Sequence, residues 1–440
     1  MQARFFKNFR NILPSGAADL IASDTIIFHC SSVLFSVLQM STMETDRGNL
    51  MFKLANRMDG LKPSVFTSLL EDKKIYEEKT GRSVLDFSLG SPDISPAPAI
   101  LETMKSAVQV PANYRYAVNP LPSLIDTICA WYLDRYGVAL DADEICLLQG
   151  SQEALSNLPM LFCNPGDIVI IPDPYYPAYK DAPALAQAEV YTCPLKPEND
   201  FLMDLDSIPE DICKRAKMIL VCYPNNPTGA VATDEFILEL IAFARKYNIV
   251  VVYDSAYADL SFDNPKSPSF LSYPGAKECG VELNSFSKTY GMAGARLGVL
   301  SGSREVLKAY RQLKSNLDYG IFLPVQYAGI TALQTGAPLA QATREKYRSR
   351  RDLMISLFAQ AGWKLPVSKA TMFIWAPIPS EYENSESFAR DLLQKTGILV
   401  TPGTSFGPEG ERFIRIALVQ NEQVIAEAAD RLTESGLFLN

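Results

Sequence analysis

Two short apolar segments with a helical segment between them constrain the fold of this 440-residue chain more than any other feature. Residues 218–222 and 249–253 are apolar at almost every position and are bounded by residues typical of turns. Strands buried on both faces have this pattern, whereas strands with one solvated face alternate apolar and polar side chains. Residues 233–247 between them read as a helix. We therefore predict parallel strands in a sheet with helices on both sides, where ligands bind at the carboxyl ends of the strands.

The alternation of strands and helices continues before these segments, and the pattern changes after about residue 338. We predict strands at 84–89, 144–148 and 167–171 and helices at 124–136 and 151–162. Beyond 338 we predict helices at 344–361, 388–396 and 422–435 and strands at 371–376 and 413–417. The predicted fold class is α/β, with a large domain built on a mostly parallel, seven-stranded type of sheet between helices and a smaller α+β domain. The expected parts are an N-terminal extension at 1–42, a large domain at 91–335, and a smaller domain formed by 43–90 and 336–440.

Charge and rare residue types exclude several classes of function. A formal charge of −9 leaves no excess of lysine or arginine to neutralise phosphates, so we expect no nucleic-acid partner. None of the eight cysteines belongs to a Cys-x-x-Cys pair, which indicates free thiols in a reducing compartment and favours a cytoplasmic protein. His29 is the single histidine, so the body of the chain cannot form a Ser-His-Asp triad or a multi-histidine site, and we expect no metal.

The first 42 residues differ from the rest of the chain. Arg4, Lys7 and Arg10 precede the first acidic residue, and an interrupted apolar segment follows at 26–38. That segment is too short and too polar to span a membrane, and we expect no membrane association. A dispensable extension, or a start codon placed too early, is the favoured interpretation; a transit peptide is the alternative.

Two loops that follow predicted strands have residues suited to binding. In the first, Gly150 separates a strand from a helix, so the unpaired amides of Ser151 and Gln152 could bind an anion; a plain strand–helix turn is the alternative. In the second, prolines at 224 and 227 flank two asparagines, which leaves Asn226 able to point its amide into a cleft. Taken alone, this loop is equally typical of a rigid surface turn.

Two further loops carry charged groups. Asp254 ends an apolar strand, where an acid is costly unless a cation such as a protonated pyridine nitrogen meets it; a capping role is the alternative. Lys288 lies among Ser285, Ser287 and Thr289, and Arg296 follows eight positions later, so an amine could stand beside a phosphate-binding cluster. The glycines of this segment do not fit a dinucleotide-binding fingerprint.

The four motifs together resemble a known family. Gly-Ser-Gln-Glu-Ala, Asn-Asn-Pro-Thr-Gly, Asp-Ser-Ala-Tyr and Ser-Phe-Ser-Lys occur in the order seen in the class I/II aminotransferases of pyridoxal-phosphate fold type I. The separations are similar too, with 28 positions from Asn226 to Asp254 and 34 from Asp254 to Lys288. The resemblance extends from about Met58 to the C-terminus, which is nearly the whole chain after the extension.

The resemblance implies a pyridoxal 5'-phosphate cofactor and a role for each matching residue. Lys288 is implied as the residue that links to the cofactor and moves the proton at the substrate's Cα, with Asp254 on the pyridine nitrogen. The other implied cofactor contacts are Asn226 and Tyr257 to the phenolic oxygen, Tyr176 stacked on the ring, and Ser151, Gln152, Ser285, Ser287 and Arg296 around the phosphate. A core tyrosine is the alternative for Tyr176.

The resemblance also implies substrate and subunit contacts. Arg415 and the backbone of Gly90 are implied to bind the substrate's α-carboxylate; a structural ion pair is the alternative for Arg415. Tyr116 is similar to a tyrosine that reaches the phosphate in a neighbouring subunit, which implies a homodimer with shared active sites. The chain departs from the family after Tyr116, where Pro120 to Leu124 replace the usual glycine and leucine–arginine pattern, so that correspondence is weaker.

The expected function is exchange of an amino group between an L-amino acid and a 2-oxo acid by a ping-pong mechanism. The chain resembles bacterial aspartate and LL-diaminopimelate aminotransferases, yet Asp318-Tyr319-Gly320 lacks the Asn-Gly expected in the latter. The sequence points to no single cation that reads a side-chain carboxylate. Two alternatives stay open: a C–S β-lyase using the same cofactor, and a regulatory or partner-binding protein on the same fold.

Overall fold

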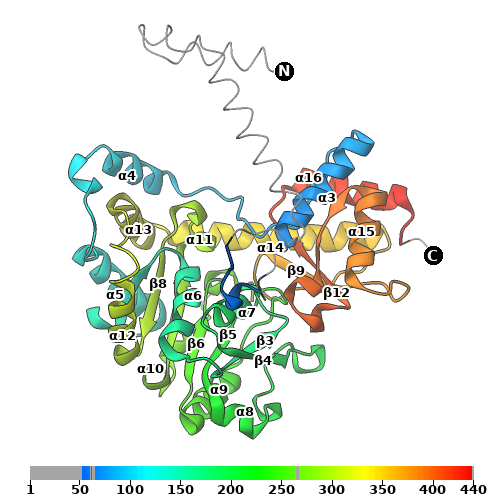
Figure 1. Ribbon diagram of the computed structural model, residues 1–440. Helices are drawn as coiled ribbons and strands as arrows, with labels where there is room; N and C mark the ends of the chain where they lie inside the picture. The colour runs from blue at the N-terminus through cyan, green and yellow to red at the C-terminus, as the bar shows by residue number, and fades with distance from the viewer. Residues whose placement is uncertain (1–51, 60, 62–64, 264–266, 439–440) are drawn as a thin grey trace. The chain divides into compact units, whose positions relative to one another are not determined.

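The two apolar segments form neighbouring parallel strands, as predicted. In this computed structural model β5 (Ala216–Cys222) pairs with β6 (Val250–Asp254), and α9 (Asp234–Tyr247) connects them. Thr233 caps α9 by accepting a hydrogen bond from the backbone of Phe236, which satisfies one of the amides left unpaired at a helix start. The pattern of continuous burial that identified the strands is therefore explained by a central position in the sheet (Figure 1).

The structure describes residues 52–59, 61, 65–263 and 267–438. Contacts between residues divide the chain into two compact units, Met1–Asn56 and Arg57–Asn440, and every strand and α-helix that the structure describes belongs to the second unit. The predicted extension at 1–42, with His29, lies outside the described residues. The domain boundaries expected within the second unit stay predictions.

The large sheet has seven strands in the order β2-β8-β7-β6-β5-β3-β4. Pairing is parallel from β7 through β4, whereas β8 is antiparallel to both β7 and β2, so the sheet is mixed but mostly parallel. The predicted fold class is confirmed. The remaining strands are β2 (Ile145–Leu148), β3 (Ile168–Asp173), β4 (Glu189–Pro194), β7 (Gly280–Ser285) and β8 (Gly298–Gly302).

Helices cover both faces of this sheet, and the side chains of a single strand contribute to both cores. On β3, Ile168 and Ile170 pack into one apolar cluster, while Val169 and Ile171 pack into the other. The first cluster contains residues of α5 (Pro122–Tyr136), α8 (Glu210–Arg215), α9, α10 (Ala276–Cys279) and α13 (Leu323–Thr335), and α4 (Pro98–Val108) contributes Ile100. The second contains residues of α6 (Ser151–Phe162), α7 (Ala178–Leu185) and α12 (Arg304–Lys314).

A second, smaller set of elements has its own apolar core. It contains an antiparallel sheet in the order β11-β12-β9 and a parallel pair, β1-β10. Its strands are β1 (Leu85–Asp86), β9 (Phe373–Pro377), β10 (Ile398–Leu399), β11 (Thr401–Pro402) and β12 (Phe413–Ala417), and its helices are α3 (Val65–Thr80), α15 (Ser385–Thr396) and α16 (Glu422–Ser435). Leu69 and Tyr76 of α3 pack with Leu393 and Leu399, so the chain on both sides of the large sheet builds this part.

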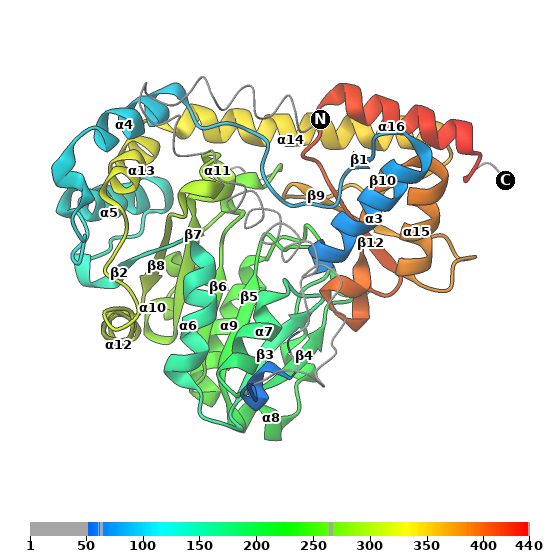
Figure 2. The ribbon, with the colours of Figure 1, turned by 45° about the horizontal axis from the view of Figure 1, so that its top comes forward.

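Two predicted elements differ most from the structure. The strand predicted at 84–89 is confined to Leu85–Asp86, the two residues that pair with β10. The helix predicted at 344–361 begins earlier: α14 is Ala337–Gln360, and Pro338 lies in its first turn, where a missing amide costs nothing. Figure 2 shows α14 running from α13 towards α16, so this helix joins the two parts.

Strand direction brings the predicted loops to one edge of the large sheet. The parallel strands β5, β6 and β7 end there at Cys222, Asp254 and Ser285. Gly298, the first residue of β8, pairs with both Leu148 and Ser285, so the loop after β2 meets the same edge. Among the described helices, none is both long enough and apolar enough to cross a membrane.

Candidate active site

A cavity of about 280 Å³ opens at this edge of the large sheet. Twelve of the thirteen predicted site residues line it, although they come from segments up to 325 positions apart. They are Gly90, Ser151, Gln152, Tyr176, Asn226, Asp254, Tyr257, Ser285, Ser287, Lys288, Arg296 and Arg415.

Lys288 lies in α11 (Phe286–Thr289), the single turn of helix that follows β7. Ser285 begins this turn and accepts a hydrogen bond from the backbone of Ser287. The Lys288 amine donates a 2.7 Å hydrogen bond to the carbonyl oxygen of Gly90. Burial, followed by the positive charges of Arg415 and Arg296, lowers the pKa of this amine to about 8. Near neutral pH the neutral amine, which acts as nucleophile or base, is therefore a larger fraction of Lys288 than of an ordinary lysine.

Asp254 is buried at the end of β6 and accepts two hydrogen bonds. The Tyr179 hydroxyl donates to Oδ2 at 2.7 Å, and the Ala256 amide donates to Oδ1 at 3.0 Å. Burial raises the pKa of this carboxyl, and the two hydrogen bonds oppose that effect. Among the described lysines and arginines, none forms an ion pair with Asp254, so a cation bound in the cavity would supply the missing charge.

The first amides of α6 and the Arg296 guanidinium form a cup for an anion. The helix starts at Ser151 and Gln152, and its N-terminal amides favour negative charge. Arg296 reaches into the cup, where its guanidinium donates to the carbonyl oxygens of Ala293 at 3.1 Å and Gln149 at 3.5 Å. Gly150 has a φ of +75°, and a Cβ there would lie 2.2 Å from the Arg296 guanidinium. A side chain at position 150 would thus exclude Arg296 from the cup.

Two aromatic residues lie on the wall beside this cup. The Tyr176 hydroxyl donates to the Gln152 side-chain oxygen at 3.0 Å, and the Tyr176 ring meets the Tyr179 ring edge-on at 5.7 Å. Tyr257 is buried, which raises the pKa of its hydroxyl well above the usual value. The Lys288 amine lies 5.9 Å from the centre of the Tyr257 ring. The amine, the phenol and a flat aromatic wall are thus available to one ligand.

Arg415 lies on β12 and points from the small sheet into the cavity. It is 1% exposed, and its guanidinium lies between the rings of Phe373 at 4.3 Å and Phe406 at 4.6 Å. It donates to the Asn226 side-chain oxygen at 3.1 Å and to the Ser88 carbonyl oxygen at 2.8 Å. Burial lowers its pKa to about 10, so the group stays charged at neutral pH. A buried, oriented guanidinium of this kind suits a carboxylate ligand.

Gly90 lies close to two of the cationic side chains that line the cavity, Lys288 and Arg415. A Cβ at this position would lie 2.9 Å from the Phe373 ring and 3.8 Å from the Arg415 guanidinium. The residue type is therefore required by close packing, and its carbonyl oxygen is left to face Lys288.

Tyr116 is the predicted site residue that the structure does not bring into the cavity. Its side chain is 78% exposed, and its ring lies 5.0 Å from that of Tyr319, which is 62% exposed. Tyr114 and Phe322 form a second exposed aromatic pair at 5.3 Å. The inferred contact of Tyr116 with a neighbouring subunit stays a prediction.

The sequence did not point to several residues that line the cavity. Tyr179 could have been predicted as a lining residue, because it lies in the same Tyr-Tyr-Pro-Ala-Tyr segment as Tyr176 and follows it by three positions, about one helical turn. Cys222 and Phe373 had none, since each looks like an ordinary buried strand residue. The other unpredicted lining residues are Leu89, Ser91, Leu155, Ala256 and Ala293.

Comparison with known proteins assigns a family to this arrangement. The profile of the family described as aminotransferase class I and II matches residues 82–432. The LL-diaminopimelate aminotransferase of Halothermothrix orenii is 42% identical over 386 residues, which are 87% of this chain and 98% of the relative.

Solved structures agree with this comparison. The substrate-bound BacF structure from Bacillus subtilis superposes with a TM-score of 0.83 at 34% identity, and covers 87% of this chain and 98% of its own. A probable N-succinyldiaminopimelate aminotransferase from Thermus thermophilus superposes with a TM-score of 0.79 at 35% identity, and covers 84% of this chain and 100% of its own.

Proposed function

This chain belongs to the class I and II aminotransferase family, and from that membership we propose that it uses pyridoxal phosphate to transfer an amino group from LL-diaminopimelate to a 2-oxo acid. The observation that carries the catalytic part is the meeting of four groups in one cavity. They are a lysine of lowered pKa, a buried acid without a described cation, an anion cup and a buried arginine.

The residues present fit the polar ends of pyridoxal phosphate. The phosphate suits the start of α6 together with Arg296, a pairing that the missing side chain at Gly150 allows. A protonated pyridine nitrogen suits Asp254, and the phenolic oxygen suits Asn226 and Tyr257. When bound, the cofactor supplies an electron sink that stabilises negative charge on the substrate's Cα.

Lys288 is proposed to carry the cofactor covalently and to move the proton. Its lowered pKa supports the first role, because a neutral amine is the nucleophile. The second role is supported by the absence of histidine from residues 43–440 and by the place of the Lys288 amine in the lining of the cavity. The Gly90 carbonyl oxygen accepts a hydrogen bond from this amine, and it would orient the amine while the amine is not linked to the cofactor.

Arg415 is proposed to bind the substrate's α-carboxylate. Its hydrogen bonds to Asn226 and Ser88 and its contacts with two aromatic rings hold the guanidinium in place before a ligand arrives. A preformed site of this kind loses little conformational entropy on binding. Because Arg415 is almost fully buried, little water screens its ionic attraction to a carboxylate.

The substrate assignment rests on relatives of similar sequence. Relatives named LL-diaminopimelate aminotransferase are 40–42% identical to this chain over at least 84% of its length. The solved relative from Thermus thermophilus, whose name refers to N-succinyldiaminopimelate, has a lower identity of 35%. The two names refer to diaminopimelate without and with a succinyl group. An experiment must therefore decide whether the free or the succinylated compound is the substrate.

A homodimer with shared active sites is proposed as the working form. The exposed aromatic residues Tyr114, Tyr116, Tyr319 and Phe322 support a buried role in an assembly, because large exposed apolar side chains gathered in one place are typical of interfaces. In this arrangement Tyr116 would reach the cofactor phosphate of the neighbouring subunit. Light scattering of the purified protein, compared with Tyr116→Asp, tests the assembly.

A half-reaction screen tests the substrate. The purified protein with cofactor is mixed with LL-diaminopimelate, N-succinyl-LL-diaminopimelate, meso-diaminopimelate or aspartate, and loss of the visible absorbance of the bound cofactor is followed. We expect LL-diaminopimelate to react with the largest rate per unit concentration. A faster reaction with the succinylated compound or with aspartate would contradict the substrate assignment and leave the family assignment intact.

A further inference from the structure

The anion cup at the start of α6 rests on a buried ion pair between Glu153, which lies in the Gly-Ser-Gln-Glu-Ala motif, and Lys314, which belongs to none of the predicted motifs. We propose that Lys314 is a positioning residue for the cofactor phosphate, because it neutralises Glu153 at the start of α6 and so keeps the cup electrically suited to an anion. This inference rests on the proposed function, since it concerns how the same site binds pyridoxal phosphate.

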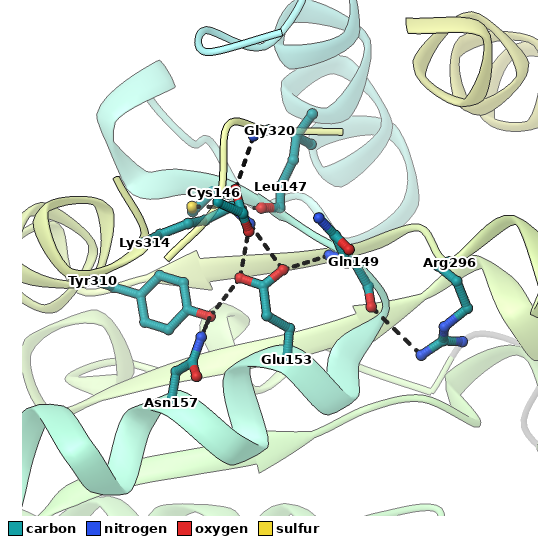
Figure 3. A network of polar contacts seen from close by, with 10 residues as sticks. Cys146, Leu147, Gln149, Glu153, Asn157, Arg296, Tyr310, Lys314 and Gly320 are labelled. Atoms are coloured by element: carbon teal, nitrogen blue, oxygen red, sulfur yellow. Dashed lines mark hydrogen bonds and ion pairs between the residues drawn. The ribbon is translucent and has the colours of Figure 1, made fainter. Parts of the chain in front are cut away.

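Glu153 stabilises the loop that forms the cup. It lies in the first turn of α6, two residues after Ser151. Its Oε2 atom accepts a 2.6 Å hydrogen bond from the Gln149 amide, which holds the turn that leads into the helix. The carbonyl oxygen of Gln149 in turn accepts from Arg296 (Figure 3). One carboxylate is therefore connected to both sides of the cup.

The same carboxylate is a liability for an anion site. Its side chain is 13% exposed, so little water screens it. A negative charge in the first turn of a helix also competes with a bound anion for the partial positive charge of that helix end. Left alone, Glu153 would therefore repel a phosphate from the place to which the α6 amides attract it.

Lys314, which lies on another helix, compensates the negative charge of Glu153. Its amine on α12 donates to both Oε atoms of Glu153 at 2.8 Å, and Tyr310 donates to Oε1 at 2.9 Å. Figure 3 shows these side chains converging on the Glu153 carboxylate from one side, with Gln149 on the other. Burial lowers the pKa of Lys314, but its bonds to Asp318 and Glu153 outweigh this effect and raise it, so the amine stays charged. An amine with 11% exposure and two acidic partners is a fixed positive charge.

The network also includes the segment next to the exposed tyrosines. Lys314 donates to Asp318 Oδ2 at 2.5 Å, and Oδ1 of the same residue accepts from the Gly320 amide at 2.8 Å. Tyr319 lies between them in sequence, and its ring contacts that of Tyr116. The lysine therefore sits between the cup and the surface proposed to face the neighbouring subunit.

Charge-specific variants distinguish this role from a purely structural one. Lys314→Met leaves Glu153 charged and uncompensated, and we expect the affinity for pyridoxal phosphate to fall by about tenfold or more. Glu153→Gln removes the repelling charge while its amide oxygen can still accept from Gln149, and we expect the affinity to stay equal or to rise. A structural role would weaken binding in both variants. The double variant Glu153→Gln/Lys314→Met is expected to recover most of the affinity lost in Lys314→Met.

The readout is titration of the apoprotein with pyridoxal phosphate and, separately, with pyridoxal, which lacks the phosphate. In Lys314→Met we expect the large loss of affinity for pyridoxal phosphate, whereas the loss of affinity for pyridoxal should be smaller than about threefold. Lys277→Met is a matched control, because Lys277 forms a similar 3.0 Å pair with Glu144 at the other end of β2, away from the cup. We expect this control to bind both ligands as the unsubstituted protein does.

Two outcomes would overturn the inference. Equal weakening of both ligands in Lys314→Met, or weakening of pyridoxal phosphate binding in Glu153→Gln, would show that the network only holds the fold. These outcomes differ from failure of the proposed function, in which the unsubstituted apoprotein would bind no pyridoxal phosphate and develop no visible absorbance. Melting temperatures of all variants, measured without ligand, show whether each one is folded.

Discussion

Lys288 and Arg415 are anchored to the same short segment of chain. The Lys288 amine donates to the carbonyl oxygen of Gly90 at 2.7 Å, and the Arg415 guanidinium donates to that of Ser88 at 2.8 Å. Lys288 follows a strand of the large sheet, whereas Arg415 lies in the small antiparallel sheet. The segment at 88–90 thus connects the proposed base to the proposed carboxylate site. A shift of this segment would therefore move both groups.

Replacing Lys288 by alanine is expected to abolish turnover. Loss of the nucleophile and proton carrier should lower kcat by about a thousandfold or more and remove the visible absorbance of the covalently held cofactor. Steady-state assays and an absorbance spectrum measure both effects. Lys277→Ala serves as the control. A Lys288→Ala protein that kept the absorbance band would contradict the assignment of the cofactor-linked lysine.

The lowered pKa of Lys288 predicts how reconstitution depends on pH. Burial and two arginines lower this pKa to about 8, so the neutral amine becomes scarcer by about tenfold for each pH unit below that value. The rate at which the apoprotein develops cofactor absorbance should therefore rise up to about pH 8 and then level off. Stopped-flow absorbance measures it. A rate that stays constant between about pH 6 and pH 8 would contradict the lowered pKa.

Replacing Asp254 by asparagine is expected to impair chemistry more than folding. Asparagine has a single side-chain oxygen, so it can accept from the Ala256 amide while its amide nitrogen donates to the Tyr179 hydroxyl, but it cannot supply the charge that a protonated pyridine nitrogen requires. We expect kcat to fall by about a hundredfold or more, with a melting temperature close to that of the unsubstituted protein. Asp167→Asn, before the opposite end of β3, should leave kcat unchanged. A small fall in kcat for Asp254→Asn would show that the charge is dispensable.

Replacing Arg415 by lysine tests the carboxylate site. Lysine keeps the charge but cannot hold Asn226, Ser88 and a carboxylate in one plane. We expect KM for the amino donor to rise by about a hundredfold and kcat to change less. Arg412→Lys, next to the same strand but bonded only to backbone carbonyls among the contacts described, is the control. An unchanged KM in Arg415→Lys would place the carboxylate elsewhere.

Asp173 predicts a pH dependence of stability. Burial, with the nearby charge of Glu409, raises the pKa of Asp173 to about 7, although the Glu409 amide donates to it at 3.2 Å. A carboxyl whose pKa is raised on folding binds its proton more tightly in the folded state, so the protein gains stability as the pH falls from about 8 towards 4. Asp173→Asn lacks this effect. It should be more stable than the unsubstituted protein at about pH 8, and the difference should shrink at about pH 5; a difference independent of pH would contradict the raised pKa.

Much of the fold could be predicted because local signals agreed with the tertiary structure. Residues 151–162 and 422–435 form helices with the predicted bounds, and in both the apolar spacing and the residues at the helix start point the same way. The antiparallel strand β8 was not predicted, because the pairing of Gly298 with both Leu148 and Ser285 depends on residues that are far apart in the sequence. Strand direction has no local signature of comparable strength.

Some residues of the candidate site could likewise be predicted from the sequence, and others could not. The place of Lys288, Asp254 and Asn226 in the cavity could be predicted because Asp254 ends a buried strand and the other two lie in segments that directly follow one. Lys314 could not, since the separation of 161 positions from Glu153 and its place on an amphipathic helix give it the appearance of a solvated surface lysine. The residues that hold the proposed chemistry in place are therefore less visible in the sequence than those that perform it.

The fixed position of Arg415 has a consequence for handedness. A carboxylate held by Arg415, an amino group directed to the cofactor and a hydrogen presented to Lys288 leave one remaining direction at the substrate's Cα for its side chain. The mirror-image amino acid would have to exchange its hydrogen with its side chain, and the contacts of Arg415 with Phe373 and Phe406 would keep the guanidinium from moving to follow it. If Arg415 binds the carboxylate as proposed, the rings that pack against it would favour one enantiomer of the substrate.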